Sequence, residues 1–315
     1  MRAARIHTWG LPPRFSLTAS LPLAPPPSTH MQLRIKAVGL HSIVRGRGQG
    51  THPSCRGATL PFDPSVDGVG LDECSGRLFY INALAAPLLA ERANVAVSDL
   101  VPLEGVGPSC CDPVAVAALV NPVSSSWMAL RRRVVGGVAG LTVLVLGVTS
   151  TSGRAAAQVA RFLGAARVLG ASRSGVDVEG VDEHILLPPA GQQLDISVVG
   201  HVHVILDYVG GTAARHVLET VVTPPGLDTQ YVHVGDLGGC DELAISGRVL
   251  NSKAIRIMGS GMGSWAKQDL RDEIPKLVEF TSTMERPGNV TTYRLEDIES
   301  AWNNVGSGVR TVVTP

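Results

Sequence analysis

A run of small hydroxylated residues between two glycines is the segment whose composition points most directly to chemistry. An apolar run, Leu141 to Leu146, precedes Gly147, and an amphipathic stretch follows Gly153. The residues with hydroxyl groups between the two glycines are Thr149, Ser150, Thr151 and Ser152. Backbone amides at a strand-to-helix turn bind phosphate groups, because the helix dipole places positive potential there. The turn is therefore predicted to bind the pyrophosphate of a dinucleotide.

This turn departs from the usual glycine-rich fingerprint, since its central positions hold serine and threonine. Such side chains narrow the approach to the backbone but can donate hydrogen bonds themselves. The alternative is an ordinary strand-to-helix turn that Ser152 caps. The order of strand, turn, helix and strand within about thirty residues favours the nucleotide site.

The segment after the second strand, Ala171 to Ser174, indicates which dinucleotide binds. A site for NAD usually has a carboxylate here that binds the ribose 2′-hydroxyl, but this segment contains no acid. Arg173 can form a bidentate pair with a 2′-phosphate, and Ser172 or Ser174 can add hydroxyl donors. We therefore expect NADPH as the cofactor. The alternative is a solvated arginine in a loop.

Alternating strands and helices must position these residues. The amphipathic helix is expected over Arg154 to Leu163 and ends before Gly164. Further candidate strands lie at His184 to Leu187, His203 to Tyr208, Tyr231 to Val234 and Ile255 to Met258. This pattern predicts an open parallel sheet with helices on both faces, which binds ligands at the carboxyl ends of its strands. The residues expected to line the cofactor site from those ends are Asp207, Val209 and Gly235, although Asp207 is equally typical of a turn.

The part of the chain before the turn has short strands and many prolines, which favours a separate β-rich domain. Met31 to Val38 alternates, so that Met31, Leu33, Ile35 and Ala37 are expected on one face. Two helices are predicted next, beginning at Pro113 and at Pro122 and capped by Asp112 and Asn121. The second is expected to end at Arg131, Arg132 and Arg133, which we interpret as structural, with contact to a cofactor phosphate as the alternative.

Composition narrows the class of protein. At 315 residues, two domains are expected, and the 44% of hydrophobic residues suffices for folding without disulfides or metals. A net charge of zero gives no reason to expect nucleic acid as a partner. No apolar run reaches the ~18 residues of a membrane span, so a soluble cytoplasmic protein without membrane partners is expected. The five cysteines are odd in number and scattered, and the adjacent pair Cys110 and Cys111 is interpreted as inert.

Taken together, these segments resemble the medium-chain dehydrogenase/reductase superfamily, in its zinc-free quinone oxidoreductase (zeta-crystallin-like) branch. The resemblance covers nearly the whole chain and includes PSVDGVG at 64–70, NPVSSSWMAL at 121–130, LDYVGG at 206–211 and YVHVGDLGG at 231–239. It implies an α/β protein with a GroES-like β-rich catalytic domain at 1–120, completed by 262–315, and a Rossmann doubly wound parallel-sheet domain at 121–261. It also implies NADPH as the hydride donor and a homodimer that pairs through edge strands of the cofactor domain.

Zinc-dependent relatives carry a catalytic cysteine near the first strand and a Gly-His-Glu where this chain has Val66, Asp67 and Gly68. His41 lies near the position of the missing cysteine. One histidine without a thiolate or a second nitrogen is a poor ligand set for zinc, so no metal is expected. His201 and His203 are interpreted as polar strand-end residues.

Without a Lewis acid, the chemistry should favour acceptors that delocalise the charge of an incoming hydride, namely quinones or α,β-unsaturated carbonyls. In the resemblance, Ser125 matches a hydroxyl residue beside the nicotinamide, and Asp67 falls in the loop that faces the substrate. The further candidates, for each of which ordinary packing or a surface position is an equal alternative, are His41, Arg45, Tyr80 and Trp127. No proton donor is identified.

The resulting hypothesis is a zinc-independent, NADPH-dependent oxidoreductase that acts on a small-molecule quinone or enone. Two alternatives stay open: an enoyl reductase of a biosynthetic pathway, and a low-turnover NADPH-binding protein that serves as a redox sensor or a structural protein.

Overall fold

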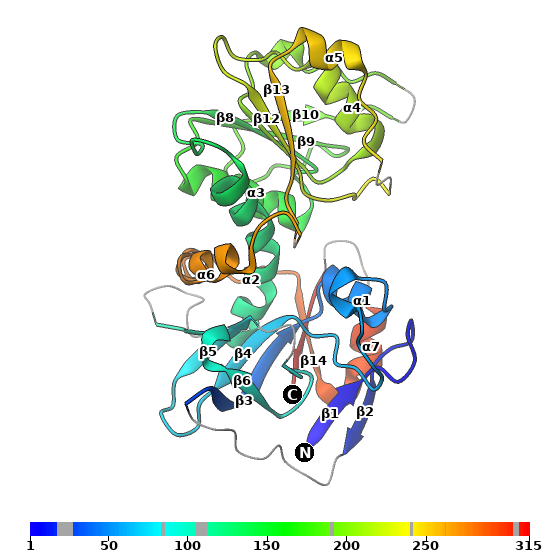
Figure 1. Ribbon diagram of the computed structural model, residues 1–315, viewed down its shortest axis with the longest axis vertical. Helices are drawn as coiled ribbons and strands as arrows, with labels where there is room; N and C mark the ends of the chain where they lie inside the picture. The colour runs from blue at the N-terminus through cyan, green and yellow to red at the C-terminus, as the bar shows by residue number, and fades with distance from the viewer. Residues whose placement is uncertain are drawn as a thin grey trace. The chain divides into compact units, whose positions relative to one another are not determined.

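The structure is a computed structural model that describes residues 1–17, 28–82, 86–104, 112–189, 192–239, 242–261, 263–304 and 309–315. Contacts divide the chain into two compact units, one of residues 1–121 with 274–315 and one of residues 122–273. Figure 1 shows the elements of both units. The sequence placed the second division at 261/262, whereas the contacts place it inside a helix, α6 (Lys267–Ser282). A boundary inside a continuous helix carries no turn signal that sequence could reveal.

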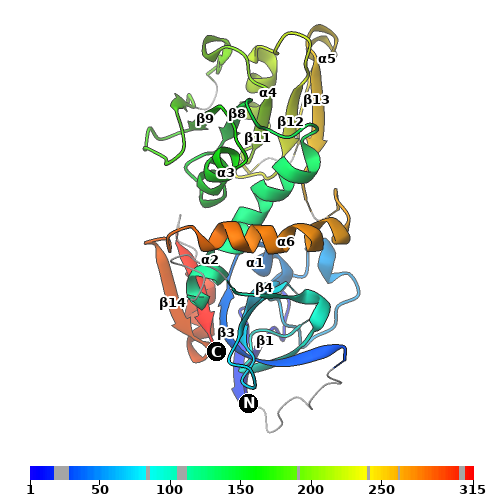
Figure 2. The ribbon, with the colours of Figure 1, turned by 90° about the vertical axis from the view of Figure 1, so that its left-hand side faces the viewer.

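The first unit is built on a seven-stranded sheet in the order β14-β15-β3-β4-β5-β7, with β6 pairing to β3. Its strands are β3 (His30–Gly39), β4 (Asp67–Leu71), β5 (Leu78–Asn82), β6 (Arg92–Ala96), β7 (Leu100–Pro102), β14 (Val290–Arg294) and β15 (Arg310–Thr314). A two-stranded sheet of β1 (Arg2–Arg5) and β2 (Arg14–Leu17) and the helices α1 (Ser42–Gly48) and α7 (Ile298–Asn303) complete it. β15 pairs with β3, so the C-terminal segment joins the first unit as expected (Figure 2).

A bulge in β3 corrects the predicted face of that strand. Leu33 and Ile35 belong to the main core of this unit, but the next core residue is Val38 and not Ala37. The pairing of β3 with β4 shifts between Ile35 and Ala37, which turns Ala37 toward a separate cluster with Ala117. A bulge inserts one residue and so reverses the side-chain alternation beyond it.

The second unit contains a six-stranded sheet in the order β10-β9-β8-β11-β12-β13, and every neighbouring pair is parallel. The strands are β8 (Thr142–Leu146), β9 (Arg167–Ser172), β10 (Glu183–Leu186), β11 (Val204–Asp207), β12 (Thr229–His233) and β13 (Ile255–Gly259). The order reverses between β8 and β11. This is the doubly wound Rossmann arrangement, whose crevice at the reversal point binds dinucleotides, and the predicted fold class is confirmed.

Helices cover both faces of the parallel sheet (Figure 1). Helix α3 (Thr151–Phe162) buries an alanine-rich stripe that includes Ala156 and Ala160, and small side chains let it lie close to the sheet. Helix α4 (Gly211–Thr220) packs Ala214 and Val217 into a core with alternate residues of the strands. A short helix, α5 (Gly247–Ser252), precedes β13.

One long helix replaces the two that the prolines predicted. Helix α2 (Pro113–Met128) continues through Pro122, and Asp112 accepts a hydrogen bond from the backbone N–H of Val114 at 2.9 Å. Val120 and Val123 on either side of Pro122 are fully buried, so packing outweighs the local disruption. The segment Pro113–Arg133 is long and apolar enough to cross a membrane, but 72% of its most apolar window is buried inside the protein, as in an ordinary core helix.

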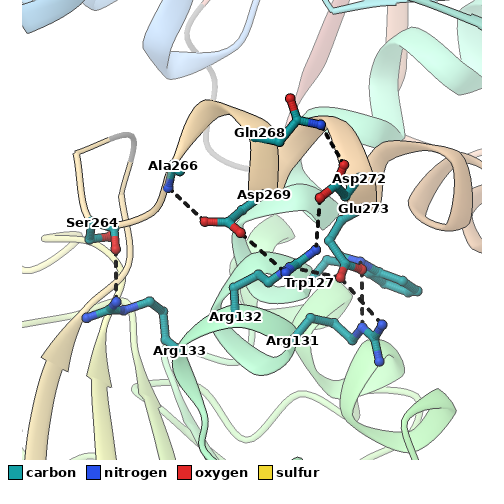
Figure 3. A network of polar contacts seen from close by, with 10 residues as sticks. All are labelled: Trp127, Arg131, Arg132, Arg133, Ser264, Ala266, Gln268, Asp269, Asp272 and Glu273. Carbon is teal, nitrogen blue, oxygen red and sulfur yellow. Dashed lines mark hydrogen bonds and ion pairs between the residues drawn. The ribbon is translucent and has the colours of Figure 1, made fainter.

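The three arginines after α2 lie in a π-helical turn, Ala129–Arg133, and make the structural contacts that we predicted (Figure 3). Glu273 lies at their centre and is 4% exposed. It accepts a hydrogen bond from the Trp127 indole at 2.8 Å and ion-pairs with Arg132 at 2.9 Å and Arg131 at 3.2 Å. Arg133 instead donates to the carbonyl oxygens of Gly259 and Ser264, each at 2.9 Å.

Burial alone would raise the pKa of Glu273, but hydrogen bonds from Trp127 and Arg131, together with the two guanidinium charges, hold the pKa below its ordinary value. The ionised carboxylate is therefore bound more strongly in the folded protein than in the unfolded chain. Its contribution to stability is complete above the ordinary pKa of about 4.3 and disappears as the pH falls through the lower folded value.

Replacing Glu273 with glutamine is expected to lower the free energy of unfolding by about 2 to 3 kcal/mol at neutral pH, because the buried side chain loses its charge-assisted hydrogen bonds to Trp127 and to the exposed Arg131 and Arg132. Urea unfolding followed by fluorescence measures this difference, which should shrink below about pH 4. Glu279→Gln, an exposed position on the same helix, is the control. A loss that does not vary with pH would contradict the role of the charge.

Candidate active site

The turn after β8 is closed by the hydroxyl of Ser150. Ser150 Oγ donates to the carbonyl oxygen of Gly147 at 2.8 Å and accepts from the backbone N–H of Gly153 at 3.0 Å. Helix α3 therefore begins at Thr151, and its cap is Ser150, where the sequence indicated a start at Arg154 and Ser152 as the alternative cap. Capping uses the hydroxyl of Ser150 but leaves the first N–H groups of the helix, those of Thr151 and Ser152, without intrahelical partners.

The two outer glycines are required by geometry. Gly147 has a φ of +91°, which L side chains rarely adopt. A Cβ atom on Gly153 would overlap the carbonyl oxygen of Gly147. Only glycine at these two positions allows the helix to start directly against the turn, so the backbone amides lie where a phosphate could approach them.

Loops from four strands meet at this edge of the sheet. Gly147 and Val148 donate backbone hydrogen bonds to the carbonyl oxygen of Ala171 at the end of β9, at 2.7 and 3.2 Å. Gly147 also faces the side chain of Val209, after β11, and Gly238, after β12, donates to the carbonyl oxygen of Val209 at 2.9 Å. The backbone N–H of Gly235 lies 3.2 Å from the carbonyl oxygen of Asp207. The structure thus brings together the predicted cofactor residues of these loops.

Asp207 has the structural contacts of a turn residue. It is fully buried, and its Oδ1 accepts from the backbone N–H groups of Val209 and Gly210 at 2.8 and 3.0 Å. Its Oδ2 accepts from the hydroxyl of Tyr231 and lies 3.5 Å from Nδ1 of His233. A cofactor contact for Asp207 remains a prediction, since these neighbours already occupy its oxygens.

His233 is a site residue that the sequence analysis did not single out. Its Nε2 lies 3.0 Å from Asp236, and its other nitrogen faces Asp207, so it stands between two carboxylates at the end of β12. The contact with Asp207 raises the pKa of His233 against the opposing effect of burial, and Asp236 adds to the rise. In the sequence, the one sign of this residue is a histidine two positions before Gly235. That sign is too weak to predict a site residue unless the pairing of β11 and β12 is known.

The end of β9 presents an exposed cation. Ser172 is 3% exposed, whereas Arg173 and Ser174 are exposed. Among the described residues, no hydrogen bond or ion pair involves the guanidinium of Arg173. The acids of the next segment, Asp182 and Glu183, pair with other arginines. Arg173 is thus available to an anion.

Ser125, the predicted residue beside the nicotinamide, contacts the end of β11. Its Oγ donates to the carbonyl oxygen of Pro122 within α2 at 2.9 Å and lies 3.4 Å from the hydroxyl of Tyr208. Because the serine proton is directed to its own helix, Tyr208 is the donor in this weak contact. Burial raises the pKa of Tyr208 to about 12, so the phenol keeps its proton at neutral pH.

Three predicted catalytic residues meet in the first unit. His41 Nε2 lies 3.4 Å from Asp67 Oδ1, and Tyr80 donates to Asp67 Oδ2 at 3.1 Å. All three are at most 5% exposed, and among the described residues neither His41 Nε2 nor Asp67 Oδ1 has a hydrogen-bond partner. Burial, followed by the charge of Asp67, raises the pKa of Tyr80. A side chain at Gly39 would overlap the His41 ring, so glycine is needed there.

Two other candidates, Arg45 and Trp127, make the structural contacts that the sequence left open as the alternative to a position in the cleft. Trp127 is 2% exposed, and its indole N–H donates to Glu273. The guanidinium of Arg45 donates to the carbonyl oxygen of Trp302 at the end of α7 and, at 3.1 Å, to that of Asn304. Guanidinium groups satisfy such unpaired helix-end carbonyls well.

His201 and His203 make the backbone contacts of strand-end residues, as predicted. His201 Nδ1 lies 3.0 Å from the carbonyl oxygen of Thr223, and His203 accepts from the backbone N–H of Thr142 at 3.2 Å. Cys110 and Cys111 lie outside the described residues. Within the described ranges, no group of three or more His, Cys, Asp or Glu side chains is placed to hold a metal ion.

Three structural observations show that the turn fits a dinucleotide phosphate: a left-handed glycine at the end of β8, a side-chain-free contact at the start of α3, and, at the end of β9, a segment (171–174) with an exposed arginine and no acid. The first two serve any dinucleotide, and the third distinguishes NADPH from NADH.

Comparisons with known proteins agree with this geometry. No family model matches the chain. A curated protein of Emericella nidulans, the probable NADPH-dependent quinone reductase tdiC, is 41% identical over 356 residues, covering 100% of both chains. The quinone oxidoreductase of Thermus thermophilus, solved also with NADPH, has a TM-score of 0.76 at 22% identity and covers 100% of both chains.

A further solved structure, the Etr1p/NADP/crotonyl-CoA complex, has a TM-score of 0.76 at 13% identity, covering 100% of this chain and 99% of the other. At such identities the solved structures establish the fold alone, a GroES-like unit joined to a Rossmann unit. The full-length 41% identity with the Emericella protein goes further: the chain belongs to the quinone oxidoreductase branch of the medium-chain dehydrogenase/reductase superfamily.

Proposed function

We propose that this protein is an NADPH-dependent oxidoreductase that reduces quinones or α,β-unsaturated carbonyls. The observation that carries the proposal is the edge where the strand order reverses, with a phosphate-binding turn beside an exposed Arg173. Family membership and the name of the Emericella relative support the same cofactor and acceptor.

The pyrophosphate would meet the start of α3. The backbone N–H groups of Thr151 and Ser152 face outward there, and the hydroxyls of Thr149 and Ser152 can add donors. Val209 and Gly235 bound the same edge from the neighbouring loops. The residues proposed to hold the 2′-phosphate are Arg173, as a bidentate guanidinium, and Ser174.

Bound NADPH supplies a hydride to the acceptor. A quinone needs one further proton to become a hydroquinone, so the protein must bind the acceptor oxygen and deliver that proton. We propose that Asp67, His41 and Tyr80 supply this proton, because they form a buried group. Within it, His41 Nε2 and Asp67 Oδ1 face each other and have no hydrogen-bond partner among the described residues. Ser125, backed by Tyr208, would accept a hydrogen bond from the carboxamide of the nicotinamide.

Three further proposals accompany the activity. Turnover is independent of zinc, since His41 and Asp67 make a two-residue group and tetrahedral zinc sites take at least three protein ligands. The protein forms a homodimer, for which the edge strand β13, paired only with β12 among the described residues, offers a free side. It acts in the cytoplasm, which suits the free thiols of Cys55 and Cys74.

Purified protein is expected to oxidise NADPH in the presence of quinones or enones, and dialysis against a chelator should leave the rate unchanged because no metal takes part. Loss of the reduced-nicotinamide absorbance across an acceptor panel measures both. Activity confined to enoyl thioesters would favour the enoyl reductase alternative. Tight NADPH binding without turnover on any acceptor would instead identify a sensor or structural protein.

Arg173→Ala should raise the Kd for NADPH by roughly tenfold to a hundredfold, because a hydrogen bond to a charged group contributes about 1.5 to 3 kcal/mol. The Kd for NADH, which has no 2′-phosphate, should change little. Titration calorimetry with both dinucleotides compares the two. Arg256→Ala, which removes an exposed guanidinium from β13, is the control. Equal losses for NADPH and NADH would contradict the assignment of Arg173.

Asp67→Asn keeps the shape of the side chain and removes its charge, so kcat should fall by about a hundredfold if this group delivers the proton. The Kd for NADPH should stay constant, because Asp67 and the cofactor turn belong to different units. Stopped-flow kinetics and circular dichroism separate a loss of chemistry from a loss of folding. An unchanged kcat in the folded variant would exclude Asp67 from the proton path.

A further inference from the structure

The loop that carries Arg173 is held by hydrogen bonds that lead to a histidine on the next strand. Ser172 Oγ donates to the carbonyl oxygen of Ser174 at 2.7 Å, which closes a turn around Arg173. The same Oγ lies 2.9 Å from Nε2 of His184 on β10. Ser172 is 3% exposed, whereas His184 is half-buried and Ser174 is exposed, so both contacts are partly buried.

The direction of the histidine contact follows from counting protons. A serine hydroxyl donates once and can accept twice, whereas a carbonyl oxygen only accepts. Because Ser172 uses its proton on Ser174, the ring of His184 must donate its Nε2–H to Ser172. The histidine thereby fixes the rotamer of the serine that closes the turn.

Strand pairing places His184 correctly for this contact. His184 lies in register with Gly170, and Leu186 with Ser172, so Gly170, Ser172 and His184 share one face of the sheet. The imidazole reaches from the level of Gly170 toward the carboxyl end to meet Ser172. The backbone N–H of Leu187 also donates to the carbonyl oxygen of Ser172, at 2.8 Å. The turn is thus tied to β10 by a backbone contact and a side-chain contact.

The charges nearby leave Arg173 to a ligand. Asp182 and Glu183, which immediately precede His184, are paired with Arg161 and Arg167. Glu179 accepts a hydrogen bond from Gln158 at 2.7 Å. These three acids are therefore engaged elsewhere. Asp177, the other acid between β9 and β10, is exposed and makes no ion pair with Arg173 among the described residues. The closed turn holds the backbone that carries the exposed guanidinium.

We propose that His184 is a positioning residue that sets the preference for NADPH over NADH. By holding Ser172, it keeps the 172–174 turn in the shape that directs Arg173 and Ser174 to the 2′-phosphate. NADH has no such phosphate and gains nothing from an ordered turn. The inference rests on the proposed function, since it concerns the same cofactor site.

The test compares His184→Phe, which removes the donor, with His184→Gln, which keeps an N–H donor. The Kd for NADPH should rise about tenfold in His184→Phe, as expected when a buried acceptor loses its partner and the turn loosens. The Kd for NADH should stay within about twofold, and His184→Gln should recover most of the NADPH affinity. His184→Ala serves if the phenylalanine variant does not fold. His201→Ala is the histidine control, since His201 is exposed and its imidazole lies within hydrogen-bond distance of the backbone carbonyl of Thr223.

A double-mutant cycle distinguishes positioning from a general loss of structure. In the Arg173→Ala background, His184→Phe should raise the Kd for NADPH much less than it does in the wild type, because the charged group that it positions is gone and only Ser174 remains. Additive losses, or equal losses for NADPH and NADH, would overturn the inference. If the wild type binds neither dinucleotide, the proposed function fails. If the wild type prefers NADPH and His184→Phe keeps that preference, the inference alone fails.

Discussion

The contact between the start of α3 and the turn after β8 is the constraint on which the cofactor half of this protein depends. No side chain fits between Gly153 and the carbonyl oxygen of Gly147, and the Ser150 hydroxyl bridges the same two residues. Since β8 adjoins the point where the strand order reverses, this contact fixes the helix start at the centre of the carboxyl edge. The loops after β9 and β11 are then built directly onto the turn through Ala171 and Val209.

The serine and threonine residues of the turn change which groups would bind a phosphate, but the phosphate would still lie at the start of α3. The hydroxyl of Ser150 already donates its proton to the carbonyl oxygen of Gly147, so it holds the turn and cannot donate to a ligand at the same time. In the proposed site, the amides of Thr151 and Ser152 take the place of the backbone amides of a glycine-rich loop. A chain can therefore lose the central glycines of the fingerprint and retain the site, provided that the two outer glycines remain.

Much of the fold could be predicted because its signals are local. Buried strands of a parallel sheet are continuous apolar runs, and the run at 141–146 predicts the strand that the structure places at 142–146. The errors arose where packing outweighs a local signal: α2 continues through Pro122, and a bulge turns Ala37 away from Ile35. Local sequence signals could not predict the contact of Asp207 with Tyr231 and His233. These residues are 24 to 26 positions apart in the sequence, and only the pairing of β11 with β12 brings them together.

The arginines show why site residues are harder to predict than folds. Arg131 to Arg133 and Arg173 all follow a regular element, and the sequence offers each the same two interpretations, structural contact or phosphate contact. What separates them is the partner that folding provides. Arg131 and Arg132 meet the buried Glu273, which satisfies their charge within the protein. After β9, in contrast, Asp182 and Glu183 are already bound to Arg161 and Arg167, and among the described residues no acid pairs with Arg173. Arg173 is therefore left exposed, on a turn that Ser172 and His184 hold closed. Its guanidinium can bind an anion without first breaking an ion pair. The proposed selectivity of the site thus depends on which arginines the carboxylates of the fold pair with, as much as on Arg173 itself.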